Sequence, residues 1–237
     1  MKQIQKSISA LQQEIQKHAQ LEAFSIDKEV YLACGKDPIS PILMAGSLES
    51  PLCFFARDLG RDEVRAGQPL YGAAGRMVRS GIYNSLYNSA ASSPQDLDKA
   101  ASYVLLTNTV PYKPIDNKAY PPKVRERFRP FILSLLMDYW QGKYIIPLGT
   151  EALQWFEKYD TSPKFKAFIK SESRFVETFE LQLTSSNPEE SKKNVLLCPL
   201  PHPSPLNQKY YALFPQMLNA RLEFLKKDLE KFTTCAG

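Results

Sequence analysis

Four short apolar segments recur along the chain, at residues 52–56, 103–106, 144–148 and 195–200, and each is followed by a polar or proline-rich turn. They lack the alternation of apolar and polar residues that marks a strand with one solvated face, so we predict strands buried on both faces. Strands of this kind, separated by helical stretches, are typical of a parallel sheet covered by helices. The pattern predicts an α/β protein, a three-layer α/β/α fold around a central, mainly parallel four-stranded sheet.

Two further segments have periodic patterns outside these four strands. Near the N-terminus, apolar residues recur every three or four positions, at Ile4, Ile8, Leu11, Ile15 and Ala19. This spacing predicts an amphipathic helix within residues 1–24 that packs on the domain. Later in the chain, Phe175, Phe179, Leu181 and Leu183 alternate with polar residues, which predicts a small additional β segment at a sheet edge or in a hairpin. We expect residues 1–237 to form one domain.

Composition restricts the class of protein further. The 30 basic and 25 acidic residues give a formal charge of +5, which is compatible with a polyanionic partner without requiring one. The four cysteines are far apart, and the two histidines are separated by most of the chain, so we expect no metal site. No apolar run suggests a secretory signal or a membrane span, and we expect a cytoplasmic protein that makes no membrane contact.

Three polar residues follow three of the predicted strands: Asp58, Asn108 and His202. Right-handed crossovers bring the loops after parallel strands to one edge of the sheet, where ligands of such sheets bind. We therefore predict that these three side chains converge on a common crevice. His202 lies between two prolines, which fix the backbone and allow the ring to be aimed at a ligand. The alternative is structural: a rigid surface turn at His202, a capped turn at Asp58 and an Asx turn at Asn108.

A glycine-rich segment lies between the first two sheet strands, at residues 67–75. Its spacing fits neither a P-loop nor a dinucleotide fingerprint that follows a strand. We therefore expect no nucleotide cofactor, and no cofactor of any kind.

Taken in order, four motifs resemble the uracil-DNA glycosylase superfamily over about residues 51–225. Residues 56–60, Ala-Arg-Asp-Leu-Gly, resemble its water-activating motif, and residues 67–75 resemble the G-x-P-F-x-G-x-A-G segment of its iron–sulfur branch. Residues 107–111 resemble its base-reading asparagine strand, and the His-Pro-Ser-Pro-Leu sequence at 202–206 resembles its DNA-facing loop. The chain lacks the cysteine spacing of the iron–sulfur branch, which indicates a divergent member.

The resemblance implies a monofunctional, metal-free DNA glycosylase that removes uracil or a related deaminated base and leaves an abasic site for base excision repair. Asp58 would position or deprotonate water, and His202 would hydrogen-bond the departing base. Asn108 would read the base, with Leu70 at the usual aromatic stacking position and Tyr71 beside it. We expect the protein to be a monomer and its partner to be DNA. Ser204 and Lys113 would contact phosphates, and Leu206 would enter the base stack as a wedge.

Three departures from the family pattern leave room for other functions. Arg57 stands where the iron–sulfur branch has a glutamate, and Leu70 stands at the aromatic position. A second hypothesis is therefore a catalytically inactive paralogue that binds damaged or single-stranded DNA. Gly60 stands where the uracil-specific branch has a tyrosine that blocks the thymine methyl group, so exclusion of thymine would have to come from another wall of the pocket. A third hypothesis is a small-molecule hydrolase on a similar scaffold.

Overall fold

The central sheet has the predicted parallel core. The computed structural model describes residues 7–185, 191–205 and 207–235, and within them six strands form one sheet in the order β1-β3-β2-β4-β6-β5. Four of these pair in parallel: β2 (Leu52–Ala56), β3 (Leu105–Asn108), β4 (Tyr144–Pro147) and β6 (Lys192–Leu197). Every residue of β2 and β3 is buried, which explains why their sequences show no polar alternation.

Antiparallel strands close both edges of the sheet. β5 (Phe179–Thr184) pairs with β6 in a hairpin, and its residues alternate between buried and exposed, so the predicted additional β segment is confirmed. The strand starts later than expected, because Phe175 belongs to the short helix η4 (Glu172–Phe175). At the opposite edge, β1 (Met44–Gly46) pairs with β3. We did not predict β1, because three residues are too few for a periodic pattern.

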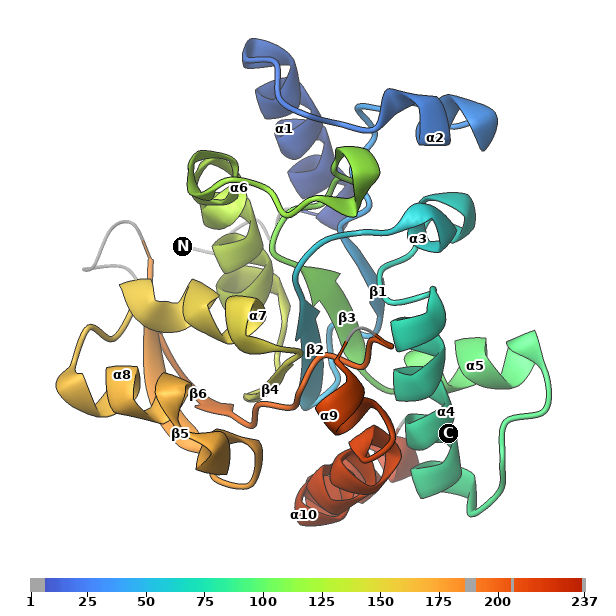
Figure 1. The fold of residues 1–237 in the computed structure, drawn as a ribbon, viewed down its shortest axis with the longest axis vertical. Coiled ribbons are helices and arrows are strands. Elements are labelled where there is room, and N and C mark those ends of the chain that lie inside the picture. Colours follow the sequence, from blue (N-terminus) through green and yellow to red (C-terminus); the bar gives the residue numbers. More distant parts are fainter. Residues whose placement is uncertain (1–6, 186–190, 206, 236–237) are drawn as a thin grey trace.

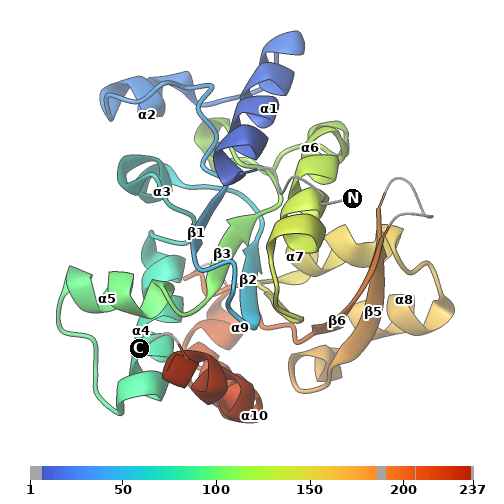
Figure 2. The same ribbon diagram turned by 180° about the vertical axis from the view of Figure 1, so that it is seen from behind.

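Helices cover both faces of the sheet, which confirms the three-layer fold (Figures 1 and 2). Successive side chains of β2 point to opposite faces, so Phe55 joins one hydrophobic cluster and Phe54 the other. The first cluster lies under α1 (Ile8–Leu21), α6 (Pro122–Ser134), α7 (Thr150–Gln154) and α8 (Pro163–Lys170). The second lies under α4 (Ala73–Tyr87), α5 (Pro94–Ala101) and α10 (Phe214–Cys235).

Shorter helices connect these layers, and one of them follows β2 directly. α3 (Arg61–Ala66) begins after the turn at the end of β2 and ends at Gly67, whose φ of +70° suits glycine. The remaining short elements are α2 (Lys28–Ala33), η1 (Ile115–Asn117), η2 (Leu135–Tyr139), η3 (Trp155–Lys158) and α9 (Gln208–Tyr211). The carboxyl ends of β2 and β3 point toward the side of the molecule where α3 lies (Figure 1).

The N-terminal amphipathic helix forms α1, with the Ser7 hydroxyl accepting from the backbone N–H of Ala10 at its start. Leu11, Ile15 and Ala19 are buried, as their spacing predicted, whereas Ile4 lies outside the described residues. Arg127 of α6 donates to the backbone carbonyls of His18 and Glu22 and so fastens the end of α1 to the domain.

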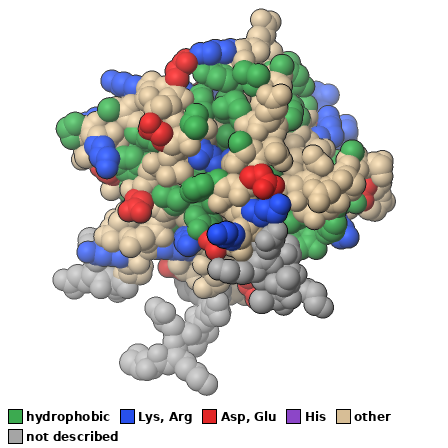
Figure 3. Space-filling view, turned by 90° about the horizontal axis from the view of Figure 1, so that it is seen from below, with side chains coloured by type: hydrophobic (Ala, Val, Ile, Leu, Met, Phe, Trp, Pro, Cys, Tyr) green, Lys and Arg blue, Asp and Glu red, His purple; other side chains and the backbone are tan. Residues whose placement is uncertain are grey.

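Charged side chains of both signs lie on one face of the molecule. The face seen from below in Figure 3 shows acidic and basic groups interspersed with hydrophobic ones. Among the described helices, none is long and apolar enough to cross a bilayer.

Substituting Ile15 tests whether α1 is part of the core. Ile15 is fully buried, so we expect Ile15→Ala to lower the free energy of unfolding by about 2–5 kcal/mol through lost burial and the cavity left behind. Lys17→Ala, at an exposed position of the same helix, is the control and should change stability by less than about 0.5 kcal/mol. Urea unfolding measures both, and equal midpoints for the two variants would contradict the packing of α1.

Candidate active site

A cleft of about 680 Å³ opens beyond the carboxyl ends of the parallel strands. Asp58, Asn108 and His202 all line it, although they are separated by up to 144 positions in sequence. The predicted convergence of these three side chains is therefore confirmed. Leu70 also lines the cleft, on the segment that leads into α4.

The register of β2 and β3 places Asp58 beside Asn108. Ala56 pairs with Asn108, so Asp58 lies two residues beyond the last paired residue of β2. Thr109 fastens this loop, because its backbone N–H donates to the carbonyls of Ala56 (2.9 Å) and Arg57 (3.1 Å) and its hydroxyl donates to the carbonyl of Arg57 (2.6 Å). The Asp58 loop is thus held by hydrogen bonds from Thr109, the residue that follows Asn108.

His202 is positioned by the neighbouring strand pair. Leu148 and Leu200 form a parallel bridge beyond β4 and β6, and the N–H of Gly149 donates to the carbonyl of Leu200 (2.8 Å). Gly149 has a φ of +89°, and a Cβ added there would lie 3.0 Å from the Cβ of His202. A glycine at this position therefore allows the His202 turn to lie against the end of β4.

The Asp58 carboxylate lies almost out of contact with water. Its side chain is 6% exposed, and Arg57 Nε lies 2.7 Å from Asp58 Oδ2. Apart from this ion pair, neither carboxylate oxygen has a hydrogen-bond partner among the described residues. Burial raises the pKa of Asp58 to about 6, and the Arg57 charge opposes that rise. Asp58 can therefore act as a base near neutral pH.

Asn108 supplies an unpaired acceptor. Its residue is 2% exposed, and its Oδ1 has no hydrogen-bond partner among the described residues. A buried polar group without a partner costs about 1–3 kcal/mol, so a ligand that brings an N–H donor to this oxygen recovers that cost. The side chain is thus suited to reading a polar edge of a bound molecule.

His202 remains accessible at the cleft although the surrounding walls displace part of its hydration. This desolvation lowers the pKa of the imidazole, and the positive charge of Arg57 lowers it further. The ring is therefore neutral at neutral pH, and a neutral imidazole offers one N–H donor to a ligand.

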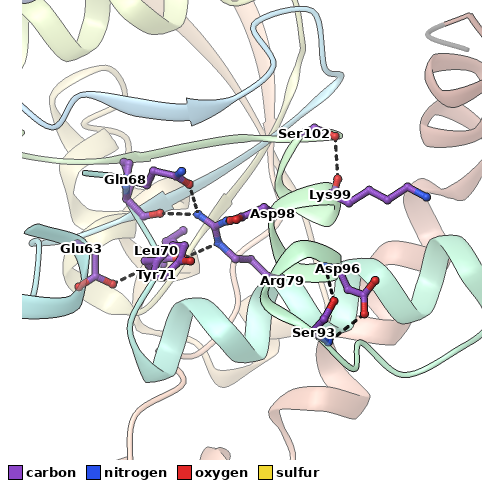
Figure 4. A network of polar contacts seen from close by, with 11 residues as sticks. Glu63, Gln68, Leu70, Tyr71, Arg79, Ser93, Asp96, Asp98, Lys99 and Ser102 are labelled. Atoms are coloured by element: carbon purple, nitrogen blue, oxygen red, sulfur yellow. Dashed lines mark hydrogen bonds and ion pairs between the residues drawn. The ribbon is translucent and has the colours of Figure 1, made fainter. Parts of the chain in front are cut away.

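The segment that carries Leu70 is held by a buried arginine (Figure 4). Arg79 of α4 is 1% exposed, and it donates to the carbonyls of Leu70 (2.8 Å) and Pro69 (3.2 Å) and to the side chains of Gln68 and Asp98. Leu70 has a φ of +52°, a conformation that branched side chains rarely adopt. Arg79 thus holds a strained backbone at the cleft.

The Tyr71 ring packs against Arg79. This ring lies 4.9 Å from the Arg79 guanidinium, and Leu70 rather than Tyr71 is among the described residues that line the cleft. The assignment of Leu70 and Tyr71 to base binding stays a prediction, but the geometry favours Leu70 for the direct contact.

Glu63 joins the two loops that form this side of the cleft. One carboxylate oxygen accepts from the N–H of Gly60 (2.9 Å), and the other accepts from the N–H groups of Tyr71 (2.8 Å) and Gly72 (2.6 Å). The loop after β2 and the segment before α4 are therefore bridged by one buried side chain. We did not single out Glu63 in the sequence, although an acidic residue three positions after a helix N-cap is a recognisable capping signal. Arg79 has no comparable signal.

The predicted DNA contacts differ in their surroundings. Lys113 is 2% exposed, and its ammonium donates to Asp27 (2.6 Å) and to the carbonyl of Pro114 (2.9 Å), so it already has partners inside the protein. Ser204 lies in the turn after His202, where its N–H donates to the carbonyl of His202 (2.9 Å). Leu206 lies outside the described residues. The DNA contacts of Lys113, Ser204 and Leu206 stay predictions. The burial of Lys113 disfavours a contact between its ammonium group and a DNA phosphate.

The family of the chain follows from a match across most of its length. A family model of the uracil DNA glycosylase superfamily matches residues 43–226. This range includes all the described residues that line the cleft except Asp27 and Val30. The chain belongs to this superfamily, and the resemblance seen in its motifs is confirmed. A search of curated proteins found no match.

Among the described residues, no group of three or more His, Cys, Asp or Glu side chains is placed to hold a metal ion. The expectation of a metal-free site stays a prediction.

Gly75 provides a test of how the cleft wall is built. A Cβ added at Gly75 would lie 2.0 Å from the backbone C and O of Leu70, so we expect Gly75→Ala to displace the Leu70 segment and to lower the free energy of unfolding by about 1–3 kcal/mol. Ala73→Ser, at the exposed start of the same helix, is the matched control and should stay within about 0.5 kcal/mol. Thermal and urea unfolding measure both effects. A stabilised Gly75→Ala variant would show that α4 does not approach Leu70 so closely.

Proposed function

We propose that this protein is a monofunctional DNA glycosylase that hydrolyses the N-glycosidic bond of uracil or a related deaminated base in DNA and leaves an abasic site, as in base excision repair. Membership of the superfamily supports this function. The observation that carries it is the cleft in which Asp58, Asn108 and His202 meet. It combines a buried carboxylate, an amide oxygen without a hydrogen-bond partner among the described residues, and a neutral imidazole.

The reaction requires three groups, and the cleft offers one for each. The bond between the sugar and the base breaks as the base leaves with the bonding electrons, so the sugar gains cationic character and a water attacks the anomeric carbon. The Asp58 carboxylate stabilises the cationic sugar, orients the water and accepts its proton. The neutral His202 donates a hydrogen bond to the base oxygen on which negative charge develops.

Base recognition falls to Asn108. Its unpaired Oδ1 accepts a hydrogen bond from the ring N–H of uracil, and its amide N–H group donates to a carbonyl oxygen of the base. Cytosine presents an acceptor where uracil presents this N–H, so the same oxygen would face a lone pair and bind poorly. The base reaches the cleft only after the nucleotide has rotated out of the duplex, or from single-stranded DNA.

Base release followed by alkaline strand scission tests the proposal. We expect oligonucleotides that contain uracil or another deaminated base to break at that position after incubation with the protein and alkali treatment. His202→Ala should lower the single-turnover rate by about 100-fold or more, because one donor to a developing negative charge is lost. Asp58→Asn and Asn108→Ala should also lose activity, while Arg65→Met, an exposed substitution on α3, serves as the matched control.

The same assay distinguishes the competing hypothesis of an inactive DNA-binding paralogue. Arg57 Nε lies 2.7 Å from Oδ2 of Asp58, the proposed general base, and this ion pair is the observation that favours the inactive paralogue. Tight DNA binding without release of any deaminated base would support the paralogue and overturn the glycosylase. Release of bases from free nucleosides, together with no salt-dependent affinity for DNA, would instead indicate a small-molecule hydrolase.

A further inference from the structure

A chain of ion pairs links helix α6 to the Asp58 carboxylate. Arg125 Nη1 of α6 lies 3.9 Å from Glu151 Oε2 at the start of α7. The other oxygen of Glu151 accepts from Arg57 Nη1 (2.9 Å), and Arg57 Nε lies 2.7 Å from Asp58 Oδ2. The guanidinium of Arg57 therefore has one carboxylate on each side: Glu151, which is 43% exposed, and Asp58, which is 6% exposed.

Arg57 is the close positive charge available to Asp58. Apart from Arg57, no described residue forms a hydrogen bond or an ion pair with either oxygen of Asp58, so the negative charge of this carboxylate is stabilised chiefly by Arg57. The other charged groups that act on it are Glu151, which disfavours its ionisation, and the more distant Arg125, which favours it. Nearby Tyr120 and His202 add no charge at neutral pH, because burial raises the pKa of the Tyr120 hydroxyl and desolvation lowers the pKa of the His202 imidazole.

We propose that Arg57 is a positioning residue that keeps the Asp58 carboxylate ionised and fixed in the cleft, and that Glu151 orients Arg57 and limits the strength of this effect. The inference rests on the proposed glycosylase function, in which Asp58 acts as a carboxylate. It explains why an arginine lies directly beside the carboxylate of Asp58, because an isolated carboxylate this deeply buried favours its neutral form.

The shape of the side chain explains why an arginine is suited to this position. Two different nitrogens of its planar group contact two different carboxylates at once, whereas a lysine ammonium is a single point charge on a flexible stem. Arg57→Lys therefore keeps the charge and loses the simultaneous contacts. We expect this variant to fall between the natural protein and Arg57→Met in every measurement below.

Profiles of kcat/KM against pH test the proposal, because they report the pKa of groups in the free enzyme. In the natural protein the rate should rise with pH through about 6, where Asp58 becomes a carboxylate. Arg57→Met removes the positive charge, so this rise should move up by about one pH unit or more, with roughly fivefold loss of kcat/KM at pH 6 and recovery near about pH 9. Glu151→Gln removes a negative charge but keeps an acceptor for Arg57, so the rise should move down by less than about one unit.

Matched variants and alternative outcomes make the test decisive. Arg65→Met on α3 and Glu157→Gln on η3 each remove one charge from a side chain that is not paired with Asp58. The pH profiles of these two variants should match that of the natural protein. A loss in Arg57→Met that is equal at every pH would indicate a structural role and overturn the proposal. A pH-independent rise in KM that grows with salt would indicate a phosphate contact and would also overturn it.

A measurement without DNA separates this inference from the proposed function. The ¹³C signal of the Asp58 carboxyl group, assigned with Asp58→Asn, gives its pKa in the free protein by NMR titration. Arg57→Met should raise that pKa and Glu151→Gln should lower it, whether or not the protein releases bases. An unchanged pKa in both variants overturns the inference even if the protein is an active glycosylase, whereas absent activity with both shifts present overturns the glycosylase alone.

Discussion

The parallel register of β2 with its neighbours is the constraint on which the site depends. Ala56 lies opposite Asn108, and the next bridge along the sheet joins Leu148 to Leu200 just before His202. A slip of one residue in either pairing would turn the functional side chain toward the opposite face of the sheet. The buried cores on both faces oppose such a slip, because every side chain of β2 would exchange its environment. Packing far below the cleft thereby fixes which polar groups meet inside it.

Within this frame, the cleft contains polar groups that the protein itself leaves unsatisfied. Among the described residues, Asn108 Oδ1 has no hydrogen-bond partner and the Asp58 carboxylate has only its ion pair with Arg57, whereas the backbone around them is bonded through Thr109 and Glu63. The scaffold is therefore rigid where it positions the site and unpaired where a ligand would bind. Such preorganisation reduces the reorganisation needed when charge develops on a substrate. The strained backbone of Leu70, held by Arg79, belongs to the same arrangement.

Much of the fold could be predicted from the sequence, because strands that are buried on both faces consist of uninterrupted apolar residues. The apolar run at residues 52–56 and the alternation near Leu181 reported a central strand and an edge strand correctly. β1 could not be predicted, because three residues are too few to show a periodic pattern. The prediction that Phe175 belongs to a strand was wrong, because this residue lies in the short helix η4. The meeting of Asp58, Asn108 and His202 followed from strand ends alone. The partners of Lys113 and Arg79 could not be predicted, because ion pairs and carbonyl contacts across 86 or 9 positions depend on packing rather than on local pattern.

The central claim is that this cleft releases a base from DNA by hydrolysis, and the products of a single turnover test it most directly. Uracil-containing DNA labelled separately in the base and in the strand should yield free uracil while the strand stays intact until alkali is added. DNA that is bound with no base released would contradict the account. Strand cleavage that accompanies base release without alkali would also contradict it, because a hydrolytic glycosylase leaves the sugar–phosphate backbone unbroken.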